Sequence, residues 1–280
     1  MDIGLLKTFL EVHRTRHFGQ AADNLFLTQS AVSARIRLLE QTVGVQLFTR
    51  TRNNIELTPA GKKLLKYAET ILTTWSRAQQ DISVIDRDHI PLAVGGVPSL
   101  WDILLQSWLN NLIAGNPNIA VHAEVNSAEV LVRRMLDNTL DLAFLFESLQ
   151  MTELVVEEVA NIVLILVTTT PGLGAKEIVN RDYVLVDWGT SFSLSHAQHF
   201  QDMAPPRVHV QLGRLAHQYI LERGGSAYLA ESMVAEDLEK GTLHVVEDAP
   251  TIKRKVYAAY PPQTDRREII EHAIAPLLRT

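Results

Sequence analysis

The segment Leu27–Arg50, LTQSAVSARIRLLEQTVGVQLFTR, carries the clearest structural pattern of the chain. Thr28 can cap the start of a helix, and Gly44 can end it. Between them, apolar residues recur three or four positions apart, which is the spacing of one helical face. These residues are Val32, Ile36, Leu39 and Val43. The segment therefore predicts an amphipathic helix with one buried stripe.

Two further helices are expected before this segment. Apolar residues from Leu5 to Val12 recur at helical spacing and predict a first helix that ends near His17. A short second helix over Gln20–Leu25 contains Ala21 and Ala22, which are small enough for another helix to pack closely. A short helix, a tight turn and an amphipathic helix together predict a helix-turn-helix, whose second helix enters the major groove of DNA.

The face opposite the apolar stripe carries short or hydrogen-bonding side chains. Gln can pair with adenine, Ser can contact a base edge or a phosphate, and Ala can lie against a thymine methyl group. An ordinary solvated helix face remains the alternative if this helix is considered alone. The candidate DNA contacts on this helix are Thr28, Gln29, Ser30, Ser33, Ala34 and Arg37.

A two-stranded ribbon is expected directly after this helix. The strands are predicted over Gln46–Thr49 and Ile55–Thr58, around a turn that contains two Asn residues. Arg50 and Arg52 at its tip would lie beside the duplex backbone or in the minor groove, where cations are favoured. The helices and the ribbon together predict a winged helix-turn-helix.

A long helix is predicted over Pro59–Asp86, with Pro59 at its first position. Its apolar residues are spaced alternately four and three apart, which is a heptad seam. Such a stripe favours pairing with a second copy, although packing on the chain's own domain is the alternative. The predicted dimerisation residues are Leu64, Ala68, Ile71, Trp75, Ala78 and Ile82.

From Ile90 onward, predicted strands alternate with predicted helices. This alternation is typical of an α/β domain with a mostly parallel sheet that is covered on both faces. Two lobes that share a hinge would leave a cleft at the carboxyl ends of the strands, where small ligands bind in open α/β sheets. The sequence thus predicts a small-molecule site in the C-terminal part.

Charge is distributed unevenly along the chain. Residues 1–87 carry 12 Lys and Arg against 8 Asp and Glu, whereas the whole 280-residue chain has a net charge of −6. There is no Cys, which excludes disulfides and thiolate metal sites. The N-terminus lacks the basic start of a signal peptide, and no apolar run approaches a membrane span. We therefore expect a cytoplasmic protein with basic charge at its N-terminus and no membrane partner.

The chain resembles the LysR-type transcriptional regulators over its full length. The resemblance is strongest in LTQSAVSARIRLLE, GVQLFTR and LTPAGKKLL. It implies a DNA-binding domain at 1–58, a linker helix at 59–88 and a periplasmic-binding-protein-like effector domain at 89–280. In that domain, residues 89–160 and 266–280 would form one lobe, and residues 161–265 the other.

The resemblance also implies partners. These are an interrupted dyad of double-stranded DNA near promoters, a second copy through the linker helix, further copies in a tetramer, and a small-molecule effector of unknown identity. Contact with RNA polymerase is left open, and association with the nucleoid follows from DNA binding. Gln29, Ser30 and Ser33 match the base-reading positions, and Arg50 matches the wing arginine.

Effector-binding residues are implied at junctions between strands and helices. There, exposed N–H groups and hydroxyls can hold a carboxylate, although Ser is also a common helix cap. Ser99, Asn126 and Ser127 occupy two such junctions, and Trp188 and Thr190 are candidates for the opposite wall. Many relatives have Pro at position 30 and a basic or polar residue at position 34, so the preferred DNA sequence stays open.

No cofactor, metal site or catalytic residue is predicted. His196, His199 and Asp202 have metal-compatible spacing, but we interpret them as a solvated helix or loop. One alternative function is an α/β solute-binding or catalytic protein with an N-terminal dimerisation module. A second alternative is a regulator that needs no effector because its cleft is closed or filled by apolar side chains.

Overall fold

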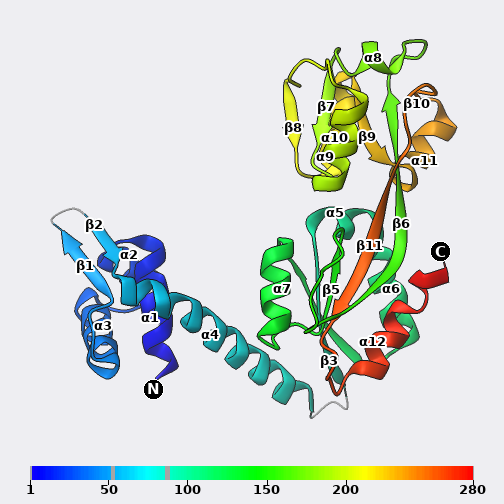
Figure 1. Ribbon diagram of the computed structural model, residues 1–280. Coiled ribbons are helices and arrows are strands. Elements are labelled where there is room, and N and C mark those ends of the chain that lie inside the picture. The colour runs from blue at the N-terminus through cyan, green and yellow to red at the C-terminus, as the bar shows by residue number, and fades with distance from the viewer. Residues whose placement is uncertain (1, 52–53, 86–88, 280) are drawn as a thin grey trace. The chain divides into compact units, whose positions relative to one another are not determined.

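The computed structural model describes residues 2–51, 54–85 and 89–279 (Figure 1). The chain divides into two compact units, Met1–Arg87 and Asp88–Thr280. The first unit is mainly helical and the second is α/β. The fold class predicted from the sequence is therefore confirmed.

The first unit begins with the three expected helices, α1 (Ile3–Thr15), α2 (Phe18–Asn24) and α3 (Gln29–Val43). Helix α2 starts earlier than predicted because Nδ1 of His17 accepts the N–H of Gln20 at 3.1 Å and so caps it. Gly44 ends α3 in the left-handed conformation, with φ of 76°.

Most of the predicted stripe of α3 is buried. Val32, Ile36 and Leu39 are fully inaccessible and pack with side chains of α1 and α2. The prediction for Val43 is wrong, since its side chain is 38% exposed in the last turn before Gly44. Burying the three stripe residues contributes about 1.5–3 kcal/mol each, which fixes the face that α3 turns outward.

Strands β1 (Phe48–Thr51) and β2 (Asn54–Leu57) pair antiparallel and form the predicted wing. The wing is attached to α3 by Glu40, whose Oε1 accepts the N–H of Leu47 at 2.8 Å. Helix α4 (Pro59–Ile85) follows and passes so close to Leu47 that a Cβ on Gly61 would lie 2.2 Å from its carbonyl oxygen. Glycine at position 61 thus permits the wing and α4 to pack together.

The first half of helix α4 packs against its own unit. Ala68 is fully buried in the core of the first unit, and that core is also contacted by Leu64 and Ile71. Ala68 therefore has no surface left for a partner. The heptad seam predicted from sequence is divided, and only its later positions remain open.

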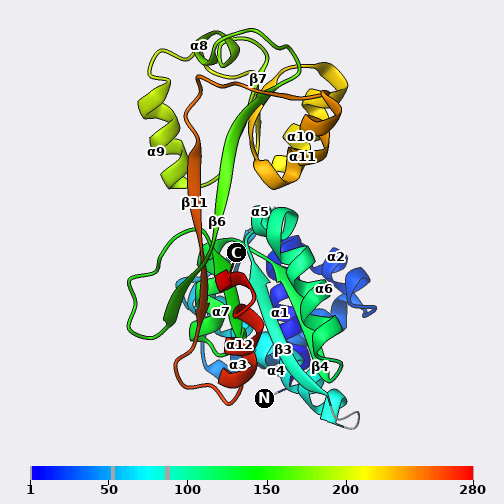
Figure 2. The same cartoon turned by 90° about the vertical axis from the view of Figure 1, so that its right-hand side faces the viewer.

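The second unit contains two lobes that are joined by two long strands (Figure 2). Lobe I consists of β3 (Ile90–Gly96), α5 (Pro98–Leu100), the π-helical turn η1 (Trp101–Leu105), α6 (Gln106–Gly115), β4 (Ile119–Val125), α7 (Ala128–Leu136), β5 (Leu142–Leu145) and, from the end of the chain, α12 (Arg267–Ile274) and η2 (Leu277–Arg279). Lobe II consists of α8 (Ala175–Ile178), β7 (Tyr183–Val186), α9 (Thr190–His199), β8 (Val208–Val210), α10 (Gly213–Arg223), β9 (Ser226–Ala230), α11 (Glu231–Lys240) and β10 (His244–Val245).

The connecting strands are β6 (Val155–Thr168) and β11 (Ile252–Tyr260), which pair antiparallel along their length. Within each lobe the pairs β3–β4, β3–β5, β7–β8 and β7–β9 are parallel, as predicted. The sheet order is β4-β3-β5-β11-β6-β9-β7-β8, with β10 beside β6. The centre of the sheet is antiparallel because one strand runs to lobe II and the other returns from it.

Candidate DNA-binding surface and effector crevice

The predicted DNA contacts of α3 lie on its outward face. Thr28, Gln29, Ser30, Ala34 and Arg37 are exposed, and Ser33 is half-buried. The Thr28 hydroxyl accepts the N–H of Ala31 at 3.2 Å and lies 3.0 Å from the Ser30 hydroxyl. The cap thus fixes the first turn while it leaves the Gln29 side chain in solvent.

The wing arginines are described only in part. The backbone of Arg50 belongs to β1, where it pairs with Ile55, but its side chain lies outside the described structure. Arg52 lies entirely outside the described residues. Their predicted contacts with the DNA backbone therefore stay predictions.

The later positions of the seam on α4 form an exposed apolar stripe. Trp75 is 46% exposed, Ile82 is 67% exposed, and Ala78 between them is half-buried. An Ile and a Trp at this spacing on a helix surface are typical of a surface that a second helix covers. We refer to Trp75, Ala78 and Ile82 as the α4 stripe.

The junction between the lobes, where the sequence predicts an effector crevice, lies at the carboxyl ends of parallel strands, and polar contacts cross it. Ser99, at the start of α5, donates its hydroxyl to the carbonyl oxygen of Gln211 in lobe II at 3.3 Å. Asp102 Oδ1 lies 2.8 Å from Nε of Arg214. The hydroxyl that was predicted to meet an effector thus holds the two lobes together in this structure.

The other four predicted effector residues have different environments. Asn126 is half-buried, whereas Ser127 and Thr190 are exposed at the starts of α7 and α9. Trp188 is 1% exposed and donates its indole N–H to the carbonyl oxygen of Tyr228 at 2.9 Å. Its ring is therefore a packed part of lobe II and forms no open wall.

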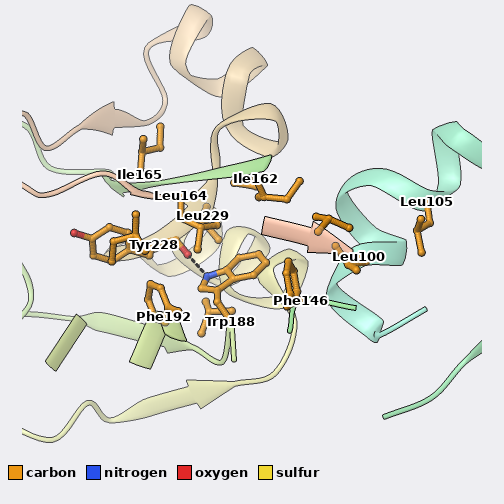
Figure 3. Packing of buried hydrophobic residues seen from close by; sticks show 14 of the residues in the cluster. Leu100, Leu105, Phe146, Ile162, Leu164, Ile165, Trp188, Phe192, Tyr228 and Leu229 are labelled. Carbon is orange, nitrogen blue, oxygen red and sulfur yellow. Dashed lines mark hydrogen bonds between the residues drawn. The ribbon is translucent and has the colours of Figure 1, made fainter. Parts of the chain in front are cut away.

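Apolar packing continues across the crevice. Leu100 and Phe146 from lobe I belong to the same packed cluster as Trp188 and Tyr228 from lobe II (Figure 3). An ideal Cβ on Gly213 would lie 2.7 Å from the Trp188 ring, so position 213 must stay small. Contact between the two lobes is thus built from both polar and apolar groups.

Sequence reasoning missed a buried arginine in this crevice. Arg254 on β11 is 3% exposed, and its Nη2 donates to Oε1 of Glu147 at 2.9 Å. Its guanidinium carbon lies 5.0 Å from the centre of the Phe146 ring. The available signal was a cation among the inward positions of β11, where Ile252 and Val256 point to the same side and are buried.

The prediction of a solvated segment holds for His199 and Asp202, which are exposed, but is wrong for His196, which lies in the core of lobe II. His196 is 5% exposed, lies 2.9 Å from the Tyr183 hydroxyl through Nε2, and is surrounded by Phe192, Phe200 and Tyr228. Burial, together with the nearby charge of His199, lowers the pKa of His196 to about 4. In the described part of the chain no three His, Asp or Glu side chains gather as metal ligands.

A separate hollow of about 320 Å³ lies in lobe II. Its lining includes Tyr183, Arg207 and Arg223, and none of the five predicted effector residues contributes to it. This hollow is therefore a different place from the crevice between the lobes.

These features define a winged helix-turn-helix protein with a two-lobed α/β domain. A family model described as "Bacterial regulatory helix-turn-helix protein, lysR family" matches residues 3–62. A second model, "LysR substrate binding domain", matches residues 87–280. The chain belongs to the LysR family of DNA-binding transcriptional regulators, and its C-terminal domain is the effector-binding domain of that family.

Relatives and solved structures agree with this assignment. The HTH-type transcriptional regulator HdfR of Escherichia fergusonii is 38% identical over 273 residues, which cover 96% of this chain and 95% of that protein. The HdfR of Escherichia coli O45:K1 has the same identity and coverage. Full-length CbnR complexed with its target DNA has a TM-score of 0.75 and 18% identity, covering 100% of this chain and 99% of that chain.

A second DNA complex has the same fold. DarR from Vibrio fischeri, solved with DNA, has a TM-score of 0.60 and 20% identity and covers 100% of this chain and 99% of its own. In the part of the chain that the structure describes, no helix is long and apolar enough to cross a membrane.

Proposed function

We propose that this regulator is a homodimer, and in its full assembly a tetramer, that binds an interrupted dyad near promoters. The exposed face of α3 reads base edges, the wing contacts the backbone, and the α4 stripe pairs two copies. Two recognition helices related by a twofold axis would then meet two half-sites.

One observation carries this proposal. In α3 the stripe of Val32, Ile36 and Leu39 is completely buried, while Gln29, Ser30 and Arg37 are exposed on the same helix. The helix therefore presents hydrogen-bonding side chains and a cation to the outside, which is the chemistry that base edges and phosphates require.

We further propose that a small molecule bound in the crevice of the second unit shifts the DNA-bound state. Asn126, Ser127 and Thr190 supply polar groups at the starts of two helices. The hydroxyl of Ser99 would give up its hydrogen bond to Gln211 and bond to the effector instead. A ligand that binds the two lobe arrangements unequally shifts the population between them, and an equal binder shifts nothing.

A second candidate function is regulation by occupancy alone, without an effector. The packed cluster of Leu100, Phe146, Trp188 and Tyr228 across the crevice favours it, because a filled crevice has no room for a ligand. Thermal unfolding with a metabolite panel separates the two, since a ligand at one hundred times its Kd adds about 2.7 kcal/mol of stability.

We infer no catalytic role. The relatives are named as regulators, and the one buried His of the α9 core faces aromatic rings and a tyrosine hydroxyl. Such a protein would act in the cytoplasm, where it would be bound to the nucleoid. Contact with RNA polymerase is part of this proposal, to be tested by co-purification on promoter DNA.

The deciding experiment is selection of bound duplexes from a random DNA library at two salt concentrations. Recovery of an interrupted dyad, with affinity that falls steeply as salt rises, supports a sequence-specific regulator. A folded, dimeric protein that recovers no motif contradicts the proposal. The α/β unit would then be the place where the function lies, as a solute-binding or catalytic domain.

A further inference from the structure

The Arg254 guanidinium is the most deeply buried cation of the interlobe crevice. Strand β11 carries it between the lobes, and its side chain is 3% exposed. A guanidinium has five N–H donors in a planar fork. Among the described residues its one hydrogen-bond partner is Oε1 of Glu147, and its buried Nε has no acceptor.

An incompletely bonded buried cation is unusual in a purely structural ion pair. Buried arginines are commonly held by two parallel hydrogen bonds to a carboxylate, because an unsatisfied charged donor is costly away from water. Here the contact is a single bond of 2.9 Å, and the carboxylate belongs to a side chain that is 47% exposed. Arg254 is thus fixed and buried, whereas Glu147 reaches it from the surface.

The ion pair lies against the start of α9. An ideal Cβ on Gly189 would lie 2.9 Å from Nη2 of Arg254 and 3.1 Å from Oε1 of Glu147. Gly189 precedes Thr190 at the first position of the ten-residue helix α9, which has no side-chain cap. Free N–H groups at a helix start attract anions. The carboxylate of Glu147 therefore lies beside both a buried cation and the start of α9, where the N–H of Gly189 donates to Oδ1 of Asp187 at 3.0 Å.

We propose that Arg254 is the anion-binding residue of the effector crevice and that Glu147 is its internal, displaceable occupant. The ligand is a small organic carboxylate, which replaces the Glu147 carboxylate and bonds both the Nε and Nη2 edge of Arg254. This inference rests on the proposed effector site. A monocarboxylate matches the single buried cation.

Displacement of the Glu147 carboxylate by the ligand would change the contact between the two lobes. Glu147 follows β5 in lobe I, while Gly189 and α9 belong to lobe II, so the internal carboxylate links the two lobes. An incoming carboxylate bonds to Arg254 in place of Glu147 and releases Glu147 from the ion pair. The apparent affinity for the ligand is reduced by the fraction of molecules in which Glu147 already occupies the site.

Butanoate is the probe. Butanamide, which has the same carbon chain but no charge, is the control ligand. Calorimetric titration of the full-length protein at constant ionic strength would compare the unsubstituted chain with Glu147→Gln, Arg254→Lys and Arg254→Met. We expect butanoate to bind roughly tenfold more tightly to Glu147→Gln, because the competing charge is gone. Arg254→Lys should bind it more weakly, Arg254→Met should lose binding, and butanamide should not bind.

Lys255→Met is the matched control. Lys255 is the next residue of β11, is exposed, and pairs with Glu158 at 2.7 Å on the outer side. This variant should bind butanoate as the unsubstituted chain does. If Arg254→Met does not fold, Glu147→Gln and Arg254→Lys still test the assignment.

The proposal is overturned if butanamide binds as well as butanoate, if Arg254→Met keeps the affinity, or if folded Glu147→Gln binds no butanoate or binds it no more tightly. Tighter binding of inorganic phosphate than of butanoate would overturn the carboxylate assignment. Library selection is measured separately. If the butanoate experiments fail but library selection recovers a DNA motif, only the Arg254 inference is refuted. If butanoate binds as expected but no DNA motif is recovered, only the proposed DNA function is refuted.

Discussion

The hydroxyl of Tyr183 lies 2.9 Å from Nε2 of His196, and their rings stack inside lobe II with centroids 5.6 Å apart. Burial raises the pKa of Tyr183, so the hydroxyl keeps its proton and can donate it to a neutral imidazole. Desolvation lowers the pKa of His196 to about 4, well below its ordinary value of 6.5. Protonation of His196 would place a charge in this buried site and so weaken the packing of α9 on β7.

This pair predicts acid sensitivity of the second unit. The unfolded chain binds a proton at His196 below pH 6.5, and the folded chain binds it only near pH 4. The stability that this residue contributes is therefore full above pH 6.5 and is lost as the pH falls to about 4. The loss is about 3 kcal/mol at most. Urea unfolding between pH 4 and 7.5 measures it.

His196→Gln should flatten that pH dependence over the same range, because the titrating group is removed. His199→Gln, at an exposed position of the same helix, should leave most of it in place. An equal slope in the unsubstituted chain and in His196→Gln would refute the assignment.

Base readout by α3 predicts a loss of sequence preference in Gln29→Ala. The affinity for the selected motif should fall by about 1–3 kcal/mol, with relaxed preference at one base pair, because a bidentate contact to a base edge is lost. Gln41→Ala, exposed in the last turn of the same helix, is the control. An unchanged motif and affinity in Gln29→Ala would show that the recognition face was wrongly assigned.

The wing predicts a different pattern for Arg50→Ala. Removal of a backbone contact should weaken binding to all sequences alike and reduce the slope of log affinity against log salt by about 1. Competition titrations with motif and scrambled duplexes at several salt concentrations measure both effects. A loss confined to the motif duplex would instead assign Arg50 to base readout.

The first unit was predictable because its signals are local. The caps Thr28 and Gly44, the buried spacing of α3 and Pro59 at the start of α4 all act within one or two helical turns. The prediction that the whole heptad seam pairs with a second copy was wrong for Ala68, which packs in the core of its own domain. Spacing states which residues share a face but not which partner covers that face.

The crevice was harder to predict because its contacts join distant residues. Arg254 and Glu147 are 107 positions apart, and neither belongs to a recognisable motif. The first part of β6 gives no clear strand signal in the sequence because Glu157 and Glu158 interrupt its apolar pattern. Only pairing with β11 makes that segment a strand, and such pairing is not encoded locally.

The α4 stripe predicts that a charge at Ile82 splits the dimer. Ile82 is 67% exposed, so Ile82→Glu should leave the fold of each chain intact while a buried carboxylate opposes pairing. Sedimentation equilibrium should report monomers for Ile82→Glu and dimers for Ser76→Glu, an exposed position off the seam. Intact dimers in Ile82→Glu would mean that the copies associate through another surface.

The buried ion pair between Arg266 and Asp141 predicts a large loss of stability when Arg266 is replaced. Nη1 of Arg266 donates to both carboxylate oxygens of Asp141 at 2.8 and 2.7 Å, and Asp141 also accepts the N–H of Ala93 at 2.8 Å. Because Asp141 is 5% exposed, Arg266→Met would leave its charge buried with one cation fewer. The expected cost is about 3–5 kcal/mol. Chemical denaturation measures it, and Arg267→Met, which removes only an exposed pair with Glu271, should change little. If both variants unfold alike, the Asp141 pair does not hold the start of α12 on β3 and β5.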